Sequence, residues 1–247
     1  MADQGARAAL ITGGSAGIGR AIAEMLAGEG YGLTLMARKP DRLRECVTAL
    51  ESGGASVLGV AGNAALEEDL DRAVAEHRDR FGRLDVLVNN AGVGLHGSIE
   101  ETSVKHLDLQ LAVNLRAAQI LMSKTAPLLR KAGAEHGKAL VVNVSSMFGR
   151  YPQAGTAAYS TTKAALVALS AAAHGELSTS GVQVTALCPG ATDTPGFAWA
   201  ADRKGDVMMP SSDVAEAVRF LLRTSGRCFV PEIALAVAGG DLHNMGA

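Results

Sequence analysis

Tyr159 and Lys163 are the two residues whose types and spacing most directly suggest chemistry. They stand four positions apart in an alanine-rich stretch, so a helix would place both side chains on one face, about one turn apart. An unperturbed tyrosine has a pKa of about 10, and a nearby cation lowers such a pKa by about one to three units. The pair therefore predicts a tyrosine that exchanges a proton with a substrate, although two residues at this spacing are also common in surface contacts.

A glycine-rich segment from Thr12 to Gly19, with the sequence TGGSAGIG, separates an apolar run from a stretch of helical period. Glycines at such a turn let the backbone approach a pyrophosphate, and the N–H groups and positive dipole end of the helix bind the anion. A tight turn with close helix–sheet packing is the alternative interpretation. The residues expected to hold a dinucleotide are Thr12, Gly13, Ser15, Gly17, Ile18 and Gly19.

Arg38 stands nineteen residues after Gly19, at the end of the second expected strand. In a dinucleotide fold this position meets the adenosine ribose, where an acidic side chain binds the 2′-hydroxyl of NAD and a guanidinium pairs with the 2′-phosphate of NADP. Arg38 therefore favours NADP(H) over NAD(H). A solvated basic pair with Lys39 at the end of a strand is the alternative.

Short apolar runs alternate along the chain with stretches of helical period. This order requires crossover helices between parallel strands, and apolar runs with little alternation suit strands that are covered on both faces. The expected strands are 7–12, 31–37, 55–61, 84–89, 139–145, 182–188 and 228–237. The expected helices are 18–29, 42–51, 66–81, 104–131, 157–177 and 212–222. The prediction is an α/β fold of Rossmann type, a doubly wound parallel seven-stranded sheet in a single domain.

Composition argues against several classes of partner. The 23 Lys and Arg against 25 Asp and Glu give a net charge of -2, which without a basic run disfavours nucleic acid and anionic membrane surfaces. The longest apolar stretch, residues 164–173, is about half of the roughly 20 residues that span a bilayer. Three cysteines without a CxxC pair and six scattered histidines predict no disulfide framework and no metal site, and they indicate the cytoplasm.

Together these motifs resemble the short-chain dehydrogenase/reductase family. The resemblance covers nearly the whole chain, and the joint spacing is far more specific than any single motif. It is carried by the glycine segment, NNAG at residues 89–92, Asn114, Ser146, Tyr159 with Lys163, and Pro189-Gly190 with Thr194. Within the family the chain is most similar to the Tyr-dependent carbonyl reductases, including the 3-oxoacyl carrier-protein reductases.

The resemblance implies a catalytic group of Asn114, Ser146, Tyr159 and Lys163. Tyr159 would act as general acid in reduction and as general base in oxidation, and Ser146 would bind the same substrate oxygen. Lys163 would hold the nicotinamide ribose and lower the pKa of Tyr159, and Asn114 would position a water that passes protons to solvent. Contacts to the cofactor are also implied for Asn90, Ala91, Gly92, Pro189, Gly190, Thr192 and Thr194.

Two positions depart from the family pattern. Asn63 stands where relatives usually carry an Asp that accepts a hydrogen bond from adenine, and its amide carbonyl can still accept one. Ser15-Ala16 stands where many NADP-binding relatives carry a basic residue, so that Arg38 would be the single phosphate partner. Neither departure touches the catalytic group, in which the thirteen-residue offset to Tyr159 selects Ser146 over the adjacent Ser145.

The substrate side is less defined by the sequence. Candidate substrate contacts are Ser146, Met147, Tyr151 and His96. Residues 190–210 predict a lid over the ligand, since this loop is long and apolar and carries Phe197 and Trp199, and a packed connector is the alternative.

The sequence thus predicts one domain, residues 1–247, that reversibly reduces a ketone or aldehyde with NADPH. An NADP-binding sensor or scaffold protein without turnover is the alternative, against which the complete catalytic group argues. A sugar-nucleotide epimerase or dehydratase is a third candidate, but the chain is short for the additional substrate region of those enzymes. Relatives are commonly joined through long helices and the last strand, so a homodimer or homotetramer is expected, and the apolar run 233–238 fits this expectation.

Overall fold

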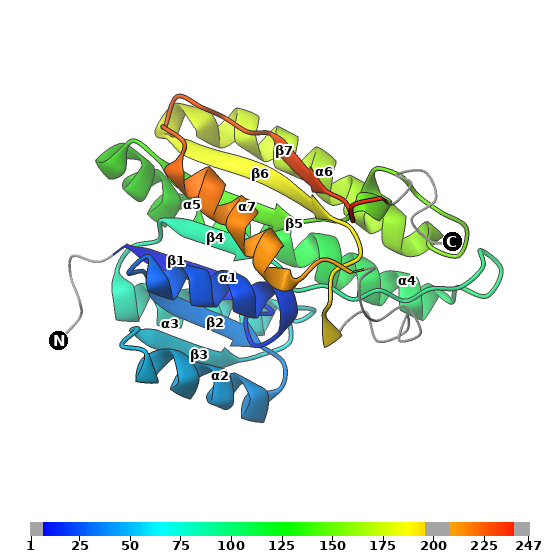
Figure 1. Ribbon diagram of the computed structural model, residues 1–247, viewed down its shortest axis with the longest axis horizontal. Helices are drawn as coiled ribbons and strands as arrows, with labels where there is room; N and C mark the ends of the chain where they lie inside the picture. The colour runs from blue at the N-terminus through cyan, green and yellow to red at the C-terminus, as the bar shows by residue number, and fades with distance from the viewer. Residues whose placement is uncertain (1–6, 196–207, 240–247) are drawn as a thin grey trace.

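The computed structural model describes residues 7–195 and 208–239 and shows a seven-stranded parallel sheet in the order β3-β2-β1-β4-β5-β6-β7 (Figure 1). The strands are β1 (Ala8–Thr12), β2 (Gly32–Ala37), β3 (Val57–Ala61), β4 (Val86–Asn89), β5 (Ala139–Val144), β6 (Val182–Pro189) and β7 (Glu232–Leu235). The predicted fold class is confirmed. Each expected strand is present, β6 one residue longer than expected and the others shorter by one to six residues.

Helices cover both faces of this sheet (Figure 1). One face carries α1 (Gly17–Gly28), α2 (Pro40–Ser52) and α7 (Ser211–Arg223), and the other carries α3 (Glu67–Phe81), α5 (Ala117–His136) and α6 (Ala157–Leu177). Successive strand residues point to opposite faces, so Ile11 packs into the core under α1 while its neighbour Leu10 packs into the core under α5. No helix in the described ranges is long and apolar enough to cross a membrane.

The expected long helix 104–131 is interrupted. Instead α4 (Val104–Leu111) runs into a π-helical turn, Ala112–Arg116, and only then into α5. Such a turn inserts a residue into the hydrogen-bonding pattern and is frequent at functional sites. Asn114 lies in this turn, and the hydrophobic period of the sequence carried no signal for the interruption.

The strand order reverses between β1 and β4. The chain builds β1, β2 and β3 outward in one direction, then returns to the other side of β1 to build β4 through β7. Because all strands are parallel, their C-terminal ends meet along one side of the sheet, here named the carboxyl edge, and their N-terminal ends meet along the amino edge. Ligands of open α/β sheets bind at the carboxyl edge beside such a reversal.

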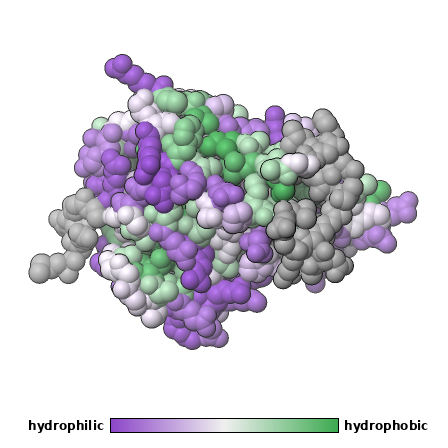
Figure 2. Space-filling view, in the orientation of Figure 1, coloured by the Kyte–Doolittle hydropathy of each residue, from purple (hydrophilic) through white to green (hydrophobic). Residues whose placement is uncertain are grey.

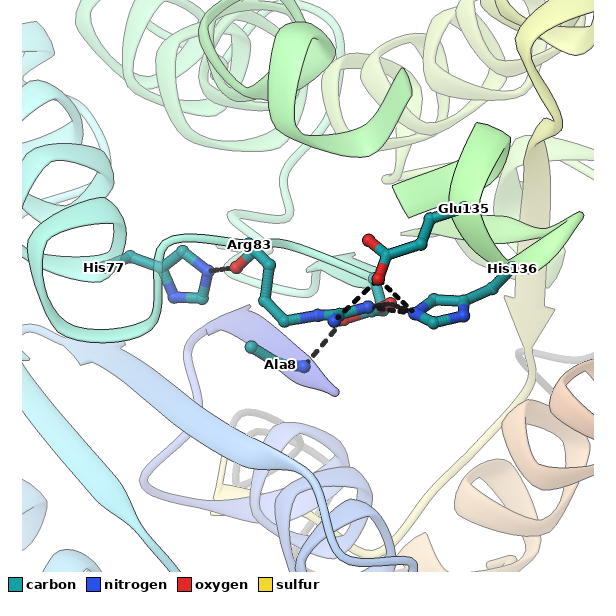
Figure 3. Close-up of polar contacts among 6 residues, drawn as sticks. Ala8, His77, Arg83, Glu135 and His136 are labelled. Atoms are coloured by element: carbon teal, nitrogen blue, oxygen red, sulfur yellow. Dashed lines mark hydrogen bonds and ion pairs between the residues drawn. The ribbon is translucent and has the colours of Figure 1, made fainter. Parts of the chain in front are cut away.

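A cluster of paired charges lies at the amino edge (Figure 3). Asp85 is buried and accepts hydrogen bonds from the Ala8 N–H at 2.8 Å and from two guanidinium nitrogens of Arg83 at 2.9 and 2.7 Å. His136 and Glu135, at the end of α5, contact the same guanidinium. The cluster joins β1, β4 and α5 at the amino edge, which is opposite the carboxyl edge where ligands of such sheets bind.

Candidate active site

The glycine turn joins β1 to α1 at the carboxyl edge. Gly13 and Gly17 have φ of 66° and 50°, a region in which side chains are strained. A Cβ at Gly13 would lie 2.7 Å from Asn90 Nδ2, and one at Gly17 would lie 2.9 Å from Thr194 Cγ2. The turn therefore requires glycine at both positions, because the segments after β4 and β6 pack directly against it.

Thr12 and Asn90 fix the glycine turn to the end of β4. Thr12 Oγ1 accepts hydrogen bonds from the N–H groups of Asn90 and Ala91 at 3.1 and 3.0 Å. Asn90 Nδ2 in turn donates to the carbonyls of Thr12 and Gly13 at 2.9 and 3.2 Å. The Asn90 side chain, for which the resemblance implied a contact with the cofactor, thus holds the turn itself in shape.

Tyr159, Ser146 and Lys163 come together at the ends of β5 and the start of α6. Ser146 and Tyr159 line one cavity, and the interaction with the Ser146 side chain favours a lower pKa of Tyr159. Lys163 is 3% exposed, and its Nζ donates to the Val144 carbonyl at 2.8 Å and lies 5.8 Å from the centre of the Tyr159 ring. The adjacent Ser145 instead donates to the Lys163 carbonyl at 2.7 Å, so Ser146 is the hydroxyl that meets Tyr159.

Burial sets the pKa of both catalytic candidates. It raises the pKa of Tyr159, which the interaction with Ser146 partly offsets, and it lowers the pKa of Lys163 to about 8. Burial is thus the largest influence on the pKa of Tyr159 in this structure, and the lowering of that pKa by Lys163 stays a prediction. Desolvation disfavours the phenolate, while the ammonium is directed to the Val144 carbonyl.

Asn114 is buried behind the segment that follows β4. Its Oδ1 accepts from the Val93 N–H at 2.8 Å, and its Nδ2 donates to the Val93 carbonyl at 2.9 Å and to Thr162 Oγ1 at 3.0 Å. Asn114 Oδ1 and Lys163 Nζ meet beside Gly92, each 3.4 Å from the place of a Cβ on that residue. The π-helical turn thus brings Asn114 to both the segment after β4 and the catalytic lysine.

Two adjoining cavities follow the carboxyl edge on either side of the reversal. The larger, about 290 Å³, is lined by Ser146, Tyr159 and Lys163, and the smaller, about 240 Å³, by Thr12, Ser15 and Asn63. Residues that line both cavities are Gly13, Ala16, Ala91, Gly92 and Val93. Of the other expected cofactor contacts, those that line the larger cavity are Gly17, Ile18, Asn90, Pro189, Gly190, Thr192 and Thr194. Gly19 lines neither and packs against Gly13 and Asn90.

Basic residues border the smaller cavity. Arg38 lies there as expected, and Lys39 and Arg42 line it too, so Arg38 is not the single basic residue beside this cavity; Arg38 as the partner of a phosphate stays a prediction. The sequence carried the missed signal, because Arg42 follows Arg38 by four residues and α2 begins between them at Pro40. Asn63 Oδ1 accepts from the Ala65 N–H at 3.1 Å and keeps a second lone pair for another donor.

The expected substrate contacts separate into two groups. His96 lines the larger cavity with its ring centre 5.7 Å from that of Tyr159. Met147 is buried and lines neither cavity, and Tyr151 lines neither as well, whereas the adjacent Phe148 does and packs edge-on against Tyr159 at 6.3 Å. Met147 begins a short helical turn after β5.

The predicted lid at 190–210 is described only at its two ends. Met209 N–H donates to the Ala191 carbonyl and the Asp193 N–H to the Met209 carbonyl, both at 2.9 Å. This pairing anchors the base of the segment beside the larger cavity. Phe197 and Trp199 lie outside the described residues.

The hydrogen-bond donors and basic side chains along the two cavities fit a dinucleotide. The N-terminus of α1 borders the larger cavity, and Ala16 at its N-cap supplies no side-chain hydrogen bond, so the first N–H groups of the helix remain to bind an anion. The glycine turn has no side chains between its backbone and the larger cavity, and three basic side chains border the smaller cavity.

A family model for short chain dehydrogenases matches residues 7–204. The chain belongs to this family. An uncharacterized oxidoreductase of Staphylococcus epidermidis is 31% identical over 235 residues, which are 95% of this chain and 99% of that protein. L-sorbose reductase from Gluconobacter frateurii, complexed with NADPH and L-sorbose, has a TM-score of 0.85 and 30% identity over 96% of this chain and 97% of its own.

A second similar structure is the 3-ketoacyl-(acyl-carrier-protein) reductase from Brucella melitensis complexed with NADH. Its TM-score is 0.86 and its identity 29%, over 95% of this chain and 97% of its own. This short-chain dehydrogenase is accordingly an oxidoreductase with a nicotinamide cofactor. The two solved relatives are complexed with different cofactors, NADPH and NADH, and are named for different substrates, so both choices depend on this chain's own residues.

Proposed function

We propose that the protein is an NADP(H)-dependent carbonyl reductase that reversibly converts a ketone or aldehyde to an alcohol. The observation that carries the proposal is that Ser146 and Tyr159 line one cavity with the buried Lys163, at the strand-order reversal. Two hydroxyls that line the same cavity suit a carbonyl oxygen that gains charge as it is reduced.

Each catalytic residue then has a defined task. Tyr159 holds its proton at neutral pH because burial raises its pKa, so it donates that proton to the substrate oxygen in reduction and removes it in oxidation. Ser146 orients the same oxygen. Lys163 holds the ribose hydroxyls, and with Asn114 beside Gly92 it returns a proton to Tyr159 through a positioned water. When bound, the nicotinamide supplies or accepts the hydride.

The preference for NADP(H) rests on Arg38, Lys39 and Arg42, which together border the smaller cavity. Guanidinium groups pair with a phosphate in a bidentate manner. We expect Arg38→Ala and Arg42→Ala each to weaken NADPH binding about tenfold and to leave NADH binding nearly unchanged. The matched control is Arg44→Ala, because Arg44 is exposed and paired with Asp41. Equal affinities of the wild type for NADPH and NADH would contradict the preference.

The deciding experiment follows NADPH consumption by the purified protein against a panel of ketones, aldehydes, quinones and acetoacetyl thioesters. Tyr159→Phe is measured beside it, with NADPH binding as the control for an intact fold. Turnover that is lost in the variant while NADPH still binds supports the reductase. Tight NADPH binding without turnover across the panel favours the alternative, an NADP sensor or scaffold. Rapid alcohol oxidation with slow reduction under matched conditions would reverse the proposed direction.

Self-association as a homodimer or homotetramer is also proposed. β7 forms one outer side of the sheet, its residues Ile233 and Leu235 are only half-buried, and Phe220 on α7 is 54% exposed. Figure 2 shows apolar residues gathered on this face in the region of α7 and β6. Sedimentation of a single monomeric species at micromolar concentration would contradict it. The cytoplasmic location and the substrate lid stay predictions.

A further inference from the structure

Three hydrogen bonds from alternate residues hold the segment after β4. The Val93 N–H donates to Asn114 Oδ1 at 2.8 Å, the Leu95 N–H donates to Gln110 Oε1 at 3.1 Å, and the Gly97 N–H donates to the Gly155 carbonyl at 2.9 Å. In an extended chain the N–H groups of alternate residues share a direction, and successive side chains point to opposite faces. The side chains of the two residues between these three therefore point to the same face as each other.

Gly94 and His96 are those residues, and both line the larger cavity while Leu95 does not. A Cβ on Gly94 would lie 3.2 Å from His96 Nε2 and 3.6 Å from Tyr159 Cε2. The imidazole and the catalytic tyrosine therefore share one side of the segment. Burial lowers the pKa of His96, and an uncharged imidazole carries one donor and one acceptor nitrogen.

Gln110 is the side chain that fixes the middle of this segment. It lies on α4, one turn before Asn114, is fully buried, and has no hydrogen-bond partner for its Nε2 among the described residues. A half-satisfied buried amide costs free energy, so an apolar side chain of similar length would be at least as stable there. The contribution of this amide therefore lies in the bond to Leu95 and not in stability.

We propose that Gln110 is a positioning residue that sets His96 beside Tyr159 through Leu95, and that His96 recognises a hydroxyl or second carbonyl close to the reacting carbonyl. This inference rests on the proposed reductase for its substrate part. A neutral imidazole binds such a group and does not select a carboxylate. The substrate class is accordingly a hydroxyketone or dicarbonyl compound rather than a plain ketone.

Gln110→Met tests the positioning without any substrate. It keeps the side-chain length but removes the acceptor for the Leu95 N–H. NMR titration of the free protein, with the His96 signal assigned through its loss in His96→Gln, should show the pKa of His96 returning toward about 6.5 in the variant. Gln183→Met is the matched control, because Gln183 is also buried and bonds a loop carbonyl, that of Gly226 at 3.1 Å, at the amino edge.

The substrate part is tested with 4-hydroxy-2-butanone and 2-pentanone, which have equal numbers of heavy atoms. We expect the wild type to prefer the hydroxyketone, and Gln110→Met to raise its KM about tenfold with kcat nearly unchanged, since the recognised group lies away from the reacting atoms. In a His96→Ala background the same substitution should change KM less than about twofold. Gln183→Met should change neither constant.

The outcomes are distinguishable. An unchanged pKa of His96 in Gln110→Met overturns the inference, as does a variant that melts earlier and loses NADPH affinity, because both indicate a merely structural glutamine. Equal kcat/KM for the two ketones overturns the substrate class. A shifted pKa of His96 in a wild-type protein that reduces no carbonyl compound supports the positioning by Gln110 and counts against the proposed function instead.

Discussion

Two lysines, the half-buried Lys138 and the buried Lys163, stand at opposite edges of the same sheet. Lys138, at the amino edge before β5, donates to the carbonyls of Leu221 and Thr224 and to Thr224 Oγ1. Lys163, at the carboxyl edge, donates to one described partner, the Val144 carbonyl. An ammonium has three donors, so Lys138 has acceptors for all of them, whereas Lys163 keeps donors for a ligand.

The polar groups around the two lysines also differ in whether they have hydrogen-bond partners within the protein. At the amino edge the Asp85 carboxylate is surrounded by the Ala8 N–H and the Arg83 guanidinium (Figure 3). At the carboxyl edge, α1 begins without a side-chain cap beside a cavity. The amino edge thus satisfies its polar groups internally and stabilises the fold. The carboxyl edge leaves polar groups to be satisfied by the cofactor and substrate, at a cost in stability.

Lys163→Met is expected to give the largest effect. Loss of the ammonium should lower kcat/KM for carbonyl reduction about a thousandfold. At pH 7 the lysine is charged in both states, and a pKa lowered from 10.5 to about 8 corresponds to roughly 3 kcal/mol of destabilisation. The free energy of unfolding should therefore rise, and steady-state kinetics with urea unfolding at pH 7 measure both changes. A variant that loses activity because it unfolds would contradict the comparison.

His77 should make the amino-edge half of the fold sensitive to acid. Its Nε2 donates to the Arg83 carbonyl and its Nδ1 accepts from Thr34 Oγ1, both at 2.8 Å, and burial lowers its pKa from 6.5 to about 4. Below pH 6.5 the unfolded chain binds a proton that the folded protein excludes, so stability is lost as pH falls from about 6.5 to about 4. The loss is about 3 kcal/mol.

Urea unfolding between pH 7 and 4 measures this loss, and His77→Gln is the comparison variant. The variant should be less stable at pH 7 but should show a smaller slope of stability against pH over the same range. Equal slopes for the two proteins would assign the acid sensitivity to other groups.

The carboxyl edge is also where the sequence was most and least informative. The glycine turn, the alternation of strands and helices and the Ser146, Tyr159 and Lys163 group were predictable, because residue type, spacing and the family resemblance place them at strand ends and on one helix face. The π-helical turn at Asn114 was not, since a single inserted residue leaves the hydrophobic period nearly unchanged. Lys39 and Arg42 were missed for another reason: their approach to the smaller cavity depends on where α2 begins.

The pKa of Tyr159 shows the limit in energetic terms. Spacing predicts that a cation lies near the phenol, but not how deeply both groups are buried. Desolvation acts on the two groups in opposite directions of pKa, upward for Tyr159 and downward for Lys163. Burial arises from tertiary packing of α6 against β6 and the turn after β5, which no local pattern encodes.

Lys138→Met should give the converse of Lys163→Met. It leaves the Leu221 and Thr224 carbonyls at the end of α7 without their donor, so the free energy of unfolding should fall by about 2 kcal/mol. The kcat/KM per folded molecule should stay within about twofold of the wild type. Differential scanning fluorimetry measures the change in stability, and kinetics at 25 °C measure kcat/KM. A loss of activity without a loss of stability would contradict the conclusion that the amino edge stabilises the fold and the carboxyl edge carries the activity.

The pH profile of the wild type sharpens the comparison by a smaller effect. Burial lowers the pKa of Lys163 to about 8, so the ammonium loses its proton above that pH while Tyr159, whose pKa is raised, keeps its own. The kcat/KM for carbonyl reduction should be flat from pH 6.5 to 7.5 and fall about tenfold per pH unit above 8. In Lys163→Arg the side chain stays charged, so kcat/KM should be lower than in the wild type but should no longer fall above pH 8. Lys138→Met should leave the midpoint of the fall in kcat/KM unchanged. A decline whose midpoint is the same in Lys163→Arg would assign it to Tyr159 and not to the lysine.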